Sequence, residues 1–456
     1  DVIIAHELCY QLFVLGDKLT AFEFIGRHND NKYKGYEGHL LFKNINNQDV
    51  YYILKAESGS ECLWKINSIE SNECVPFMFA KYVTIVSNLP EHAQEIEERE
   101  YAEVNDKPIP DKTKTTASFS GLANSSYGAD LIGCLRMDVD DLGKLFSTKI
   151  KDKDFDLATL SYISRELNYF FKIVLSDICK GPVEIVGGKN KIITDLISKG
   201  YEERGGRYVS IVYSGGDDLF ILGAWDETAE LAFDIQKCFD SYFTRIMAKI
   251  DTSIRLTISA GLTLHKDKYP LYQIAKHSKE AEEEAKSFKY NLEAKAQKNK
   301  ICLFYSPSYK YKNNELNIIA ANNIRANQKD NHDKFVYALN WNEDKMFKIM
   351  NILISLCEKQ VDKIVINNIS RALVYKLFSL AETWWYKNSL YVPHLYYTIE
   401  RLGKISQNGT ENKAELIHQL RDLIIMLPLS EHEHNAIKYF KIPLTWFDLL
   451  LRNKGE

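Results

Sequence analysis

The chain has 456 residues, 45% of them hydrophobic and 26% charged, an ordinary balance for a globular protein of two or three domains. Its formal net charge of −4 excludes binding to nucleic acid by bulk positive charge alone. The eight cysteines include no CxxC pair, and no apolar run reaches membrane-spanning length, so we expect reduced thiols, a cytoplasmic location and no membrane association.

Residues 1–125 show a mixed α/β pattern. Strand-like runs occur at 39–42 and 50–54, whereas 91–120 is first acidic and then rich in Pro, Lys, Thr and Ser. That composition is typical of a linker or an exposed connection. The chain begins at Asp1, without Met, which suggests a fragment of a longer protein. We therefore expect residues 1–125 to be a connecting region.

Residues 126–308 alternate between strand and helix patterns. The expected order is strand, helix, strand, strand, helix, strand, followed by one more helix and strand. This order is typical of an α+β, ferredoxin-like fold, an antiparallel sheet with helices on one face that is called a palm in polymerases and nucleotidyl cyclases. The expected elements are strands at 131–139, 208–213, 219–223, 254–264 and 300–306, and helices at 156–180, 226–249 and 271–289.

Residues 309–456 have apolar residues at helical spacing, for example in FKIMNILISL and ELIHQLRDLIIML. This pattern predicts a separate C-terminal helical bundle. The aromatic run Trp384, Trp385 and Tyr386 is expected to be helical core, with base stacking on RNA as the alternative.

Acidic residues cluster at two strand ends of the expected palm. Asp138 and Asp140 end the first strand, two residues apart, and Asp217 and Asp218 lie in the hairpin between the next two strands. Nucleotidyl transfer needs carboxylates that hold two divalent cations, Mg²⁺ or Mn²⁺, against a triphosphate such as that of ATP. The pattern therefore predicts Asp138, Asp217 and Asp218 as catalytic, metal-binding residues, unless the turn is only a solvated hairpin tip.

Glycines accompany both acidic segments. Gly215 and Gly216 precede the Asp pair, where a tight hairpin is expected to need positive φ and where absent side chains would admit a triphosphate. Gly143 follows the first strand and is expected to lie below the phosphates.

Three motifs together resemble one known family. RMDVDDLGKLF (136–146), YSGGDDLFILG (213–223) and TISAGLTL (257–264) resemble the large polymerase-like subunit of type III CRISPR effector complexes, in its Csm-type version. ELCYQLFVLGDKL (7–19) resembles the segment after that family's zinc-binding module. The resemblance implies that 1–125 contains a remnant of the first palm, that 126–308 is the second, catalytic palm, and that the N-terminal HD nuclease domain is absent.

The resemblance also implies a function. The family converts ATP into cyclic oligoadenylates when its complex, with guide RNA and a small subunit among its parts, binds a target RNA. Asp217 and Asp218 match the metal-binding aspartates of its GGDD signature, and Asp138 matches the first-strand carboxylate. His332-Asp333 is a chance pair in a polar stretch, so no DNase activity is expected.

Several further residues are candidates for nucleotide binding. Ser214 stands where the family often has Ala, and Asp141 where it often has Asn. Lys286 and Lys300 are expected to meet the triphosphate, as in nucleotidyl cyclases, although a solvated helix face is the alternative. Ser259 borders the expected site, with a plain packing role as the alternative.

Two other functions stay open from the sequence. A cyclic dinucleotide synthase of the GGDEF type would carry Glu-Phe where this chain has Asp218-Leu219. An inactive palm would serve as a scaffold for RNA and partner subunits, but buried like charges are costly without a metal ion.

Overall fold

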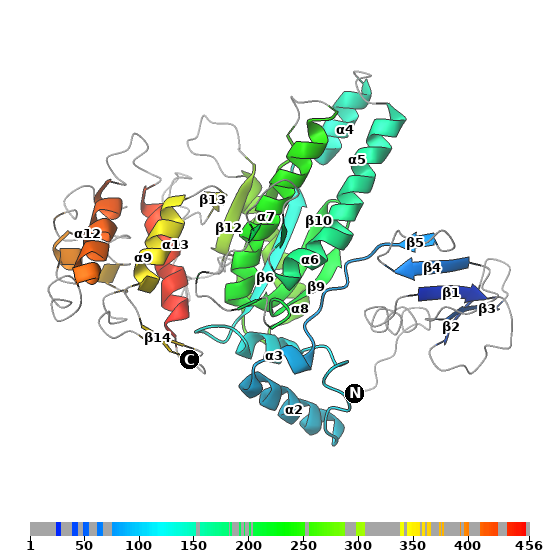
Figure 1. Ribbon diagram of the computed structural model, residues 1–456, viewed down its shortest axis with the longest axis horizontal. Helices are drawn as coiled ribbons and strands as arrows, with labels where there is room; N and C mark the ends of the chain where they lie inside the picture. Colours follow the sequence, from blue (N-terminus) through cyan, green and yellow to red (C-terminus); the bar gives the residue numbers. More distant parts are fainter. Residues whose placement is uncertain are drawn as a thin grey trace, which may run out of the picture.

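A computed structural model describes the strands and helices of most of the chain (Figure 1). Segment 7–19, which resembles the part of the family that follows its zinc-binding module, lies outside the described residues, as do the pair His332-Asp333 and the run 384–386. The described residues are 24–28, 39–43, 49–53, 62–66, 75–151, 156–181, 183–184, 191–192, 196, 200–201, 204–250, 255–287, 298–305, 338–341, 344–355, 358–360, 363–365, 374, 376–377, 393, 396–400, 411–426 and 436–452.

A six-stranded sheet forms the centre of the molecule, in the order β13-β12-β11-β6-β10-β9. Four of these strands, in the order β11-β6-β10-β9, pair antiparallel with their neighbours, as the ferredoxin-like prediction requires. β12 adds to β11 in parallel through α8, because a helix crosses between them. The bounds are β6 Ile132–Val139, β9 Val209–Ser214, β10 Asp218–Ala224, α7 Trp225–Met247, β11 Ile258–His265, α8 Leu271–Ser287 and β12 Lys300–Tyr305.

Helices cover both faces of this sheet rather than one. A Cβ on Gly133 of β6 would lie 2.8 Å from Trp225 Cα, so the odd-numbered face of β6 packs on α7. A Cβ on Gly261, which pairs with Arg136 of β6, would lie 2.3 Å from the backbone nitrogen of Glu282 in α8. The even-numbered face of β6, which carries the acidic residues, therefore lies under α8.

The first long helix of the palm is continuous but irregular. It runs through α5 Leu157–Tyr169, the π-helical segment η3 Phe170–Val174 and α6 Leu175–Lys180, close to the predicted span 156–180. Phe170 and Phe171 are fully buried and pack edge to face at 5.4 Å between ring centroids. A shorter helix, α4 Leu142–Lys151, follows β6 (Figure 1).

The N-terminal region contains a second sheet, β2-β3-β1-β4-β5, which lies to one side of the palm (Figure 1). Its strands are β1 Phe24–His28, β2 His39–Lys43, β3 Asp49–Ile53, β4 Cys62–Ile66 and β5 Val75–Phe77. β2 and β3 agree with the strand-like runs predicted from the sequence.

The acidic stretch predicted as a linker is instead a packed helix. α2 Glu91–Asn105 lies against α3 Phe119–Asn124, and Ala93 is fully buried between them. Glu97 of α2 is 6% exposed and accepts a hydrogen bond from the backbone N–H of Ser118, the N-cap residue of α3. The acidic residues of this stretch therefore belong to a helix, and one of them, Glu97, is buried against the start of α3.

The segment before α2 also belongs to the palm. Tyr82 Oη donates to the carbonyl oxygen of Arg207 at 2.7 Å, and the N–H of Ile211 donates to the carbonyl oxygen of Tyr82 at 2.9 Å. Thr84 Oγ1 donates to the carbonyl oxygen of Val209 at 2.8 Å. Contacts with the palm therefore begin near residue 80, well before the predicted boundary at 126.

The C-terminal helical region predicted from the sequence is present, and it packs on the palm and shares its hydrophobic core. β13 Ala338–Asn340 extends the palm sheet, so the sheet does not end at the predicted residue 308. Trp341 Nε1 donates to the carbonyl oxygen of Ile258 at 2.8 Å, and Trp446 stacks 6.5 Å from Phe233 of α7. The helices are α9 Asp344–Ser355, α12 Glu411–Met426 and α13 Ala436–Leu450, with a small hairpin of β14 Glu358–Gln360 and β15 Lys363–Val365.

The expectations about membrane-spanning segments and cysteine thiols can be compared with the described residues. None of the helices in the described ranges is long and apolar enough to cross a membrane. The five described cysteines, Cys62, Cys134, Cys179, Cys238 and Cys302, are all free thiols.

Candidate active site

Two neighbouring strands place two carboxylates side by side. Asp218, the first residue of β10, lies directly opposite Asp138 of β6 in the antiparallel register, so both side chains occupy one face of the sheet. Asp217 precedes β10 in the turn, and its carbonyl oxygen accepts a 2.9 Å hydrogen bond from the backbone N–H of Val139. The three acidic residues predicted from the sequence therefore meet at one edge of the palm sheet.

Negative charge accumulates at this edge. Burial raises the pKa of Asp217 above its ordinary value, and the carboxylates of Asp138 and Asp218 raise it further. A nearby positive charge offsets such repulsion, so this group of carboxylates favours a cation.

Two cationic side chains of the protein lie against these carboxylates. Lys286 of α8 donates from Nζ to Asp138 Oδ2 and, at 2.7 Å, to Glu282 Oε1. Arg136 of β6 donates from Nε to Glu282 Oε2 at 3.0 Å, and its Nη2 lies 3.7 Å from Asp218 Oδ2. Burial lowers the pKa of Lys286, but its hydrogen bonds to Asp138 and Glu282 outweigh burial and leave that pKa raised, so Lys286 stays charged.

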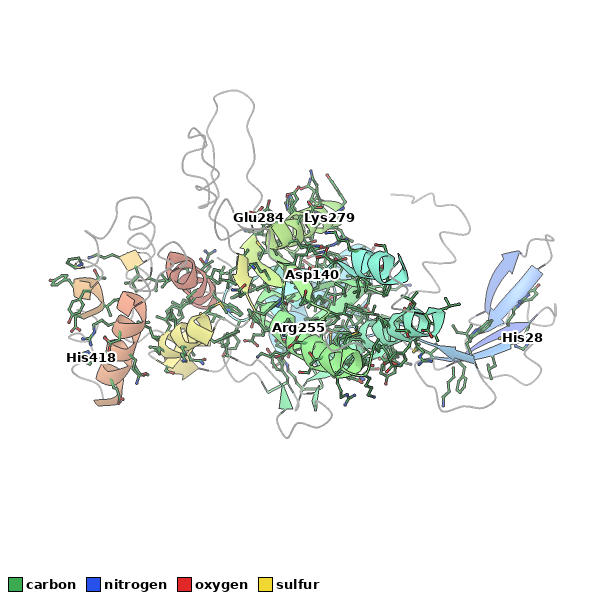
Figure 2. All side chains as sticks on the ribbon, turned by 90° about the horizontal axis from the view of Figure 1, so that it is seen from above. His28, Asp140, Arg255, Lys279, Glu284 and His418 are labelled. Carbon is green, nitrogen blue, oxygen red and sulfur yellow. The ribbon has the colours of Figure 1, made fainter. Side chains whose placement is uncertain are left out.

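Asp140 belongs to a separate, internal group of hydrogen bonds near the middle of the palm (Figure 2). Its carboxylate accepts 2.8 Å hydrogen bonds from the hydroxyls of Thr257 and Ser259 and a 2.9 Å hydrogen bond from the N–H of Asn299. Burial raises the pKa of Asp140 although these hydrogen bonds lower it. Ser259 is fully buried, its hydroxyl donates to Asp140, and it lies opposite Asp138 in the sheet, so its place beside a nucleotide stays a prediction.

The turn after β6 leaves open space beside positive charge. Asp141 has a left-handed backbone with φ of 54°, and its carboxylate lies 2.9 Å from Nζ of both Lys144 and Lys298. Hydrogen bonds from Lys144 and Lys298 hold the pKa of Asp141 below its usual value. No atom lies within 4 Å of the place a Cβ would take on Gly143. The room predicted at Gly143 is present, and contact of Gly143 and Asp141 with a nucleotide stays a prediction.

The glycines of the hairpin act through their small size. Neither Gly215 nor Gly216 has positive φ, so the predicted need for that conformation is wrong. A Cβ on Gly215 would lie 2.4 Å from Tyr213 Oη and 2.7 Å from Asp218 Oδ1, so a larger residue would displace the ends of these two side chains. A Cβ on Gly216 would meet only Asn168, at 3.9 Å, so the approach to Gly216 is open.

Ser214 ties the hairpin to the irregular helix. Its hydroxyl donates a 2.6 Å hydrogen bond to the carbonyl oxygen of Phe171 in η3. A π-helical segment changes the backbone hydrogen-bond pattern, and Ser214 satisfies one of its carbonyl groups. The hydroxyl hydrogen is therefore engaged within the protein, and contact of Ser214 with a nucleotide stays a prediction.

Lys300 begins β12, and its backbone N–H donates a 3.5 Å hydrogen bond to Oγ of Ser259, the residue opposite Asp138 in the sheet. Lys300 is only 1% exposed, on a strand that pairs with β11 on one side and β13 on the other. The side chain of Lys300 is therefore buried, and its contact with a triphosphate stays a prediction. Lys286 contacts Asp138, one of the predicted catalytic residues.

Three residues of the site were missed by the sequence reasoning. Arg136 stands two positions before Asp138 on a strand, and Glu282 stands four positions before Lys286 on a helix, so both spacings placed them on the relevant face. Tyr213 is half exposed, and the charge of Asp218 raises its pKa.

The donor set has the chemistry of a magnesium or manganese site. Carboxylate oxygens are the hard ligands that these cations prefer. Across the described part of the chain, however, no three His, Cys, Asp or Glu side chains stand close enough to hold a metal ion. Lys286 holds Asp138, and Arg136 lies near Asp218. The residues therefore fit a cation by charge and chemistry, provided that Asp138 exchanges its lysine.

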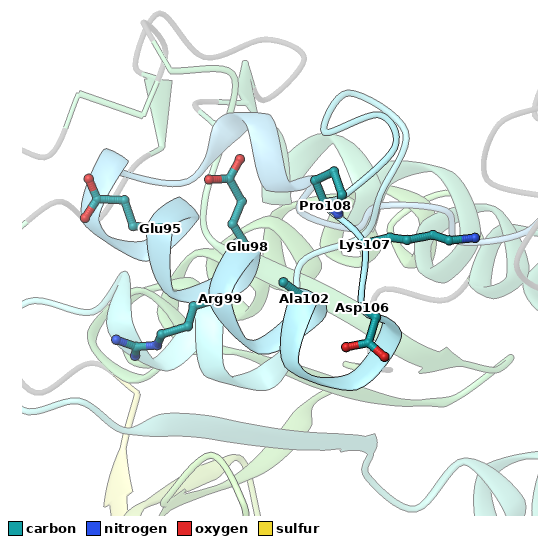
Figure 3. A pocket seen from close by; sticks show the side chains of 7 residues that line it. All are labelled: Glu95, Glu98, Arg99, Ala102, Asp106, Lys107 and Pro108. Atoms are coloured by element: carbon teal, nitrogen blue, oxygen red, sulfur yellow. The ribbon is translucent and has the colours of Figure 1, made fainter.

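A shallow pocket of 540 Å³ lies elsewhere, on α2 and the residues that follow it (Figure 3). Charged residues of both signs line it, among them Glu98, Arg99, Asp106 and Lys107. None of its lining residues belongs to the carboxylate group.

Comparison with known proteins agrees with this geometry. Residues 131–302 match the family model of the second palm domain of Cas10/Cmr2. The matched segment therefore belongs to that palm family, and it spans every strand that contributes an acidic residue to the site.

Curated relatives narrow the assignment. The chain is 34% identical over 159 residues to the Cas10/Csm1 subtype III-A single-strand-specific deoxyribonuclease of Thermococcus onnurineus, and 31% identical over 186 residues to that of Enterococcus italicus. These matches cover 35% and 41% of this chain but only 18% and 19% of the relatives. Family model, relatives and fold together support a Csm-type Cas10 subunit, as the motifs predicted.

Solved structures share the fold. Csm1 of T. onnurineus has a TM-score of 0.60 at 20% identity, with 95% of this chain and 49% of that chain covered. A Csm1–Csm4 cassette with one ATP also has a TM-score of 0.60 at 20% identity, with 98% of this chain and 50% of that chain covered. The chain thus spans about half the length of these structural neighbours.

Proposed function

We propose that this chain is an ATP-dependent cyclic oligoadenylate synthase of a type III CRISPR effector complex, activated by target RNA. The observation that carries the proposal is the register of β6 and β10, which sets Asp218 opposite Asp138 with Asp217 in the adjoining turn. Related Csm1–Csm4 cassettes were solved with one ATP, with cA3 and with cA4, which supports a nucleotide-handling palm.

Asp138, Asp217 and Asp218 would hold Mg²⁺ or Mn²⁺. A divalent cation bound there lowers the pKa of an attacking ribose hydroxyl and offsets the charge of the triphosphate. Lys286 supplies a flexible point charge for phosphate oxygens. The open space at Gly143 and Gly216 admits a triphosphate close to the backbone.

The proposed partners follow from the family. One structural neighbour is a subcomplex of Csm1 with Csm4, which supports assembly with other effector subunits, including a small subunit. Guide RNA and target RNA complete the proposed complex. The matched segment covers only 18% and 19% of relatives named as deoxyribonucleases, so the proposal for the palm does not include that activity.

Replacing Asp217 and Asp218 together by Ala tests the proposal. The complex assembled with the variant should bind RNA normally but form no oligoadenylate from ATP, measured by mass analysis of the products. A matched control is Asp177→Ala with Asp240→Ala, which removes two aspartates of the helical layer away from the site. Product formation at the wild-type rate by the Asp217 and Asp218 variant would refute the assignment.

The two alternatives give different results in simple assays. A cyclic dinucleotide synthase would form a two-nucleotide ring from ATP or GTP, which mass analysis distinguishes from larger oligoadenylates. A scaffold without catalysis would show no ATP binding by calorimetry, with or without Mg²⁺.

A further inference from the structure

Five side chains at the candidate site form a chain of alternating charge. Asp138 accepts from Lys286, Lys286 also donates to Glu282, Glu282 accepts from Arg136, and Arg136 lies 3.7 Å from Asp218. The two ends of this series, Asp138 and Asp218, are carboxylates that lie opposite each other in the sheet. Within this group, Glu282 is the residue that contacts both cations, Lys286 and Arg136.

The fold holds Glu282 firmly. Its side chain is 9% exposed, and its two oxygens are divided between Lys286 at 2.7 Å and Arg136 at 3.0 Å. Gly261 lies directly below, where a Cβ would approach the Glu282 nitrogen to 2.3 Å. The absence of a side chain at Gly261 thus lets α8 approach the sheet closely at the turn of helix that carries Glu282.

Lys286 and a divalent cation compete for Asp138, and Glu282 offers Lys286 a second partner. Asp138 cannot bind a divalent cation while it holds the ammonium group of Lys286, and a released lysine on a helix end would normally turn to solvent. Glu282 keeps a second contact with Lys286, one helical turn away, that does not depend on Asp138.

We propose that Glu282 is a positioning residue that retains Lys286 beside the site while Lys286 exchanges Asp138 for a phosphate oxygen of the incoming nucleotide. Lys286 thereby neutralises Asp138 in the metal-free protein and becomes a phosphate contact when a cation takes its place. This inference rests on the proposed function and identifies how the charge of Asp138 is offset in the metal-free protein.

Lys286→Met gives opposite changes for the two ligands. Removing a competing ion pair should tighten Mn²⁺ binding without nucleotide, measured by electron paramagnetic resonance of free Mn²⁺, by roughly twofold to fivefold. Loss of a charged hydrogen bond should weaken binding of a non-hydrolysable ATP analogue with Mn²⁺, measured by calorimetry, by about tenfold. Weaker Mn²⁺ binding by this variant would overturn the exchange.

Glu282→Gln tests the positioning role through a double-mutant cycle. The variant should weaken binding of the ATP analogue severalfold, and the same change made in the Lys286→Met background should have little further effect. Glu283→Gln, on the exposed side of the same helix, is the matched control and should leave both affinities unchanged. If Glu282→Gln fails to fold, Glu282→Asp takes its place. This variant keeps the charge and should retain part of the wild-type affinity for the ATP analogue.

The outcomes separate the inference from the proposed function. No binding of the ATP analogue by the wild-type chain with Mn²⁺ would refute the proposed function and this inference with it. Binding by the wild type, with equal losses from Glu282→Gln whether or not Lys286 is present, would refute the positioning role alone.

Discussion

Gly261→Ala tests the close contact between α8 and the palm sheet. The added Cβ would lie 2.3 Å from the nitrogen of Glu282 and 2.6 Å from the carbonyl carbon of Ala281. Both are backbone atoms, so a side-chain rotation cannot relieve the clash. Ordinary contact requires α8 to move away from β11 by about 1 Å.

The expected cost follows from the packing of the core. Forcing an extra carbon into a well-packed interior costs about 1–3 kcal/mol of unfolding free energy. For a domain the size of this palm, each kcal/mol lowers the melting temperature by about 2–4 °C. The shift should also draw Lys286 away from Asp138, so binding of the ATP analogue should weaken in the same variant.

Gly143→Ala is the matched control for stability. It makes the same chemical change in the first turn of α4, where no atom lies within 4 Å of the new Cβ. Alanine is the better helix former, so this variant should unfold at the same temperature as the wild type or slightly above it. Calorimetric melting of both variants gives the comparison, and a Gly261→Ala protein as stable as the wild type would refute the reasoning.

Two further predictions concern buried charge elsewhere in the palm. Burial and the neighbouring His277 lower the pKa of His265 to about 4, so the unfolded chain binds the extra proton first and stability should fall as pH drops from about 6.5 towards 4. His265→Gln should flatten this fall in melting temperature, and an unchanged pH profile would contradict it. Arg207→Met removes the 2.5 Å ion pair with buried Asp234 and should lower the free energy of unfolding, measured with denaturant, by about 3–5 kcal/mol. Adding Asp234→Leu should recover part of this loss. A loss below about 1 kcal/mol would count against a structural role for the pair.

The sheet of the palm was predictable because its signals are local. Apolar runs such as 131–139 and 219–223 indicate buried strands, and the Gly-Gly-Asp-Asp segment between two of them indicates a hairpin. The ferredoxin-like order then follows from general rules of strand connection, and it places the ends of the first and third strands side by side. The proximity of Asp138 and Asp218 therefore follows from sequence pattern and topology together.

The boundaries were not predictable in the same way. α2 is acidic over most of its surface, and only its packing against α3 distinguishes it from a linker. β13 is three residues long and joins the sheet from far along the chain. Such elements are stabilised by distant partners, and a local pattern carries little information about them.

The amino-acid sequence by itself predicted the resemblance to the Cas10 palm, the palm topology and the three acidic candidate residues, because each depends on residue type and spacing along one strand or hairpin. Only the tertiary structure showed that Lys286 contacts Asp138. Lys286 and Lys300 are alike in sequence, but one lies on a helix above the carboxylates and the other is buried in a strand. The contact of Glu282 with Arg136 and the close approach at Gly261 likewise depend on how α8 packs on the sheet, a distance that no single segment specifies.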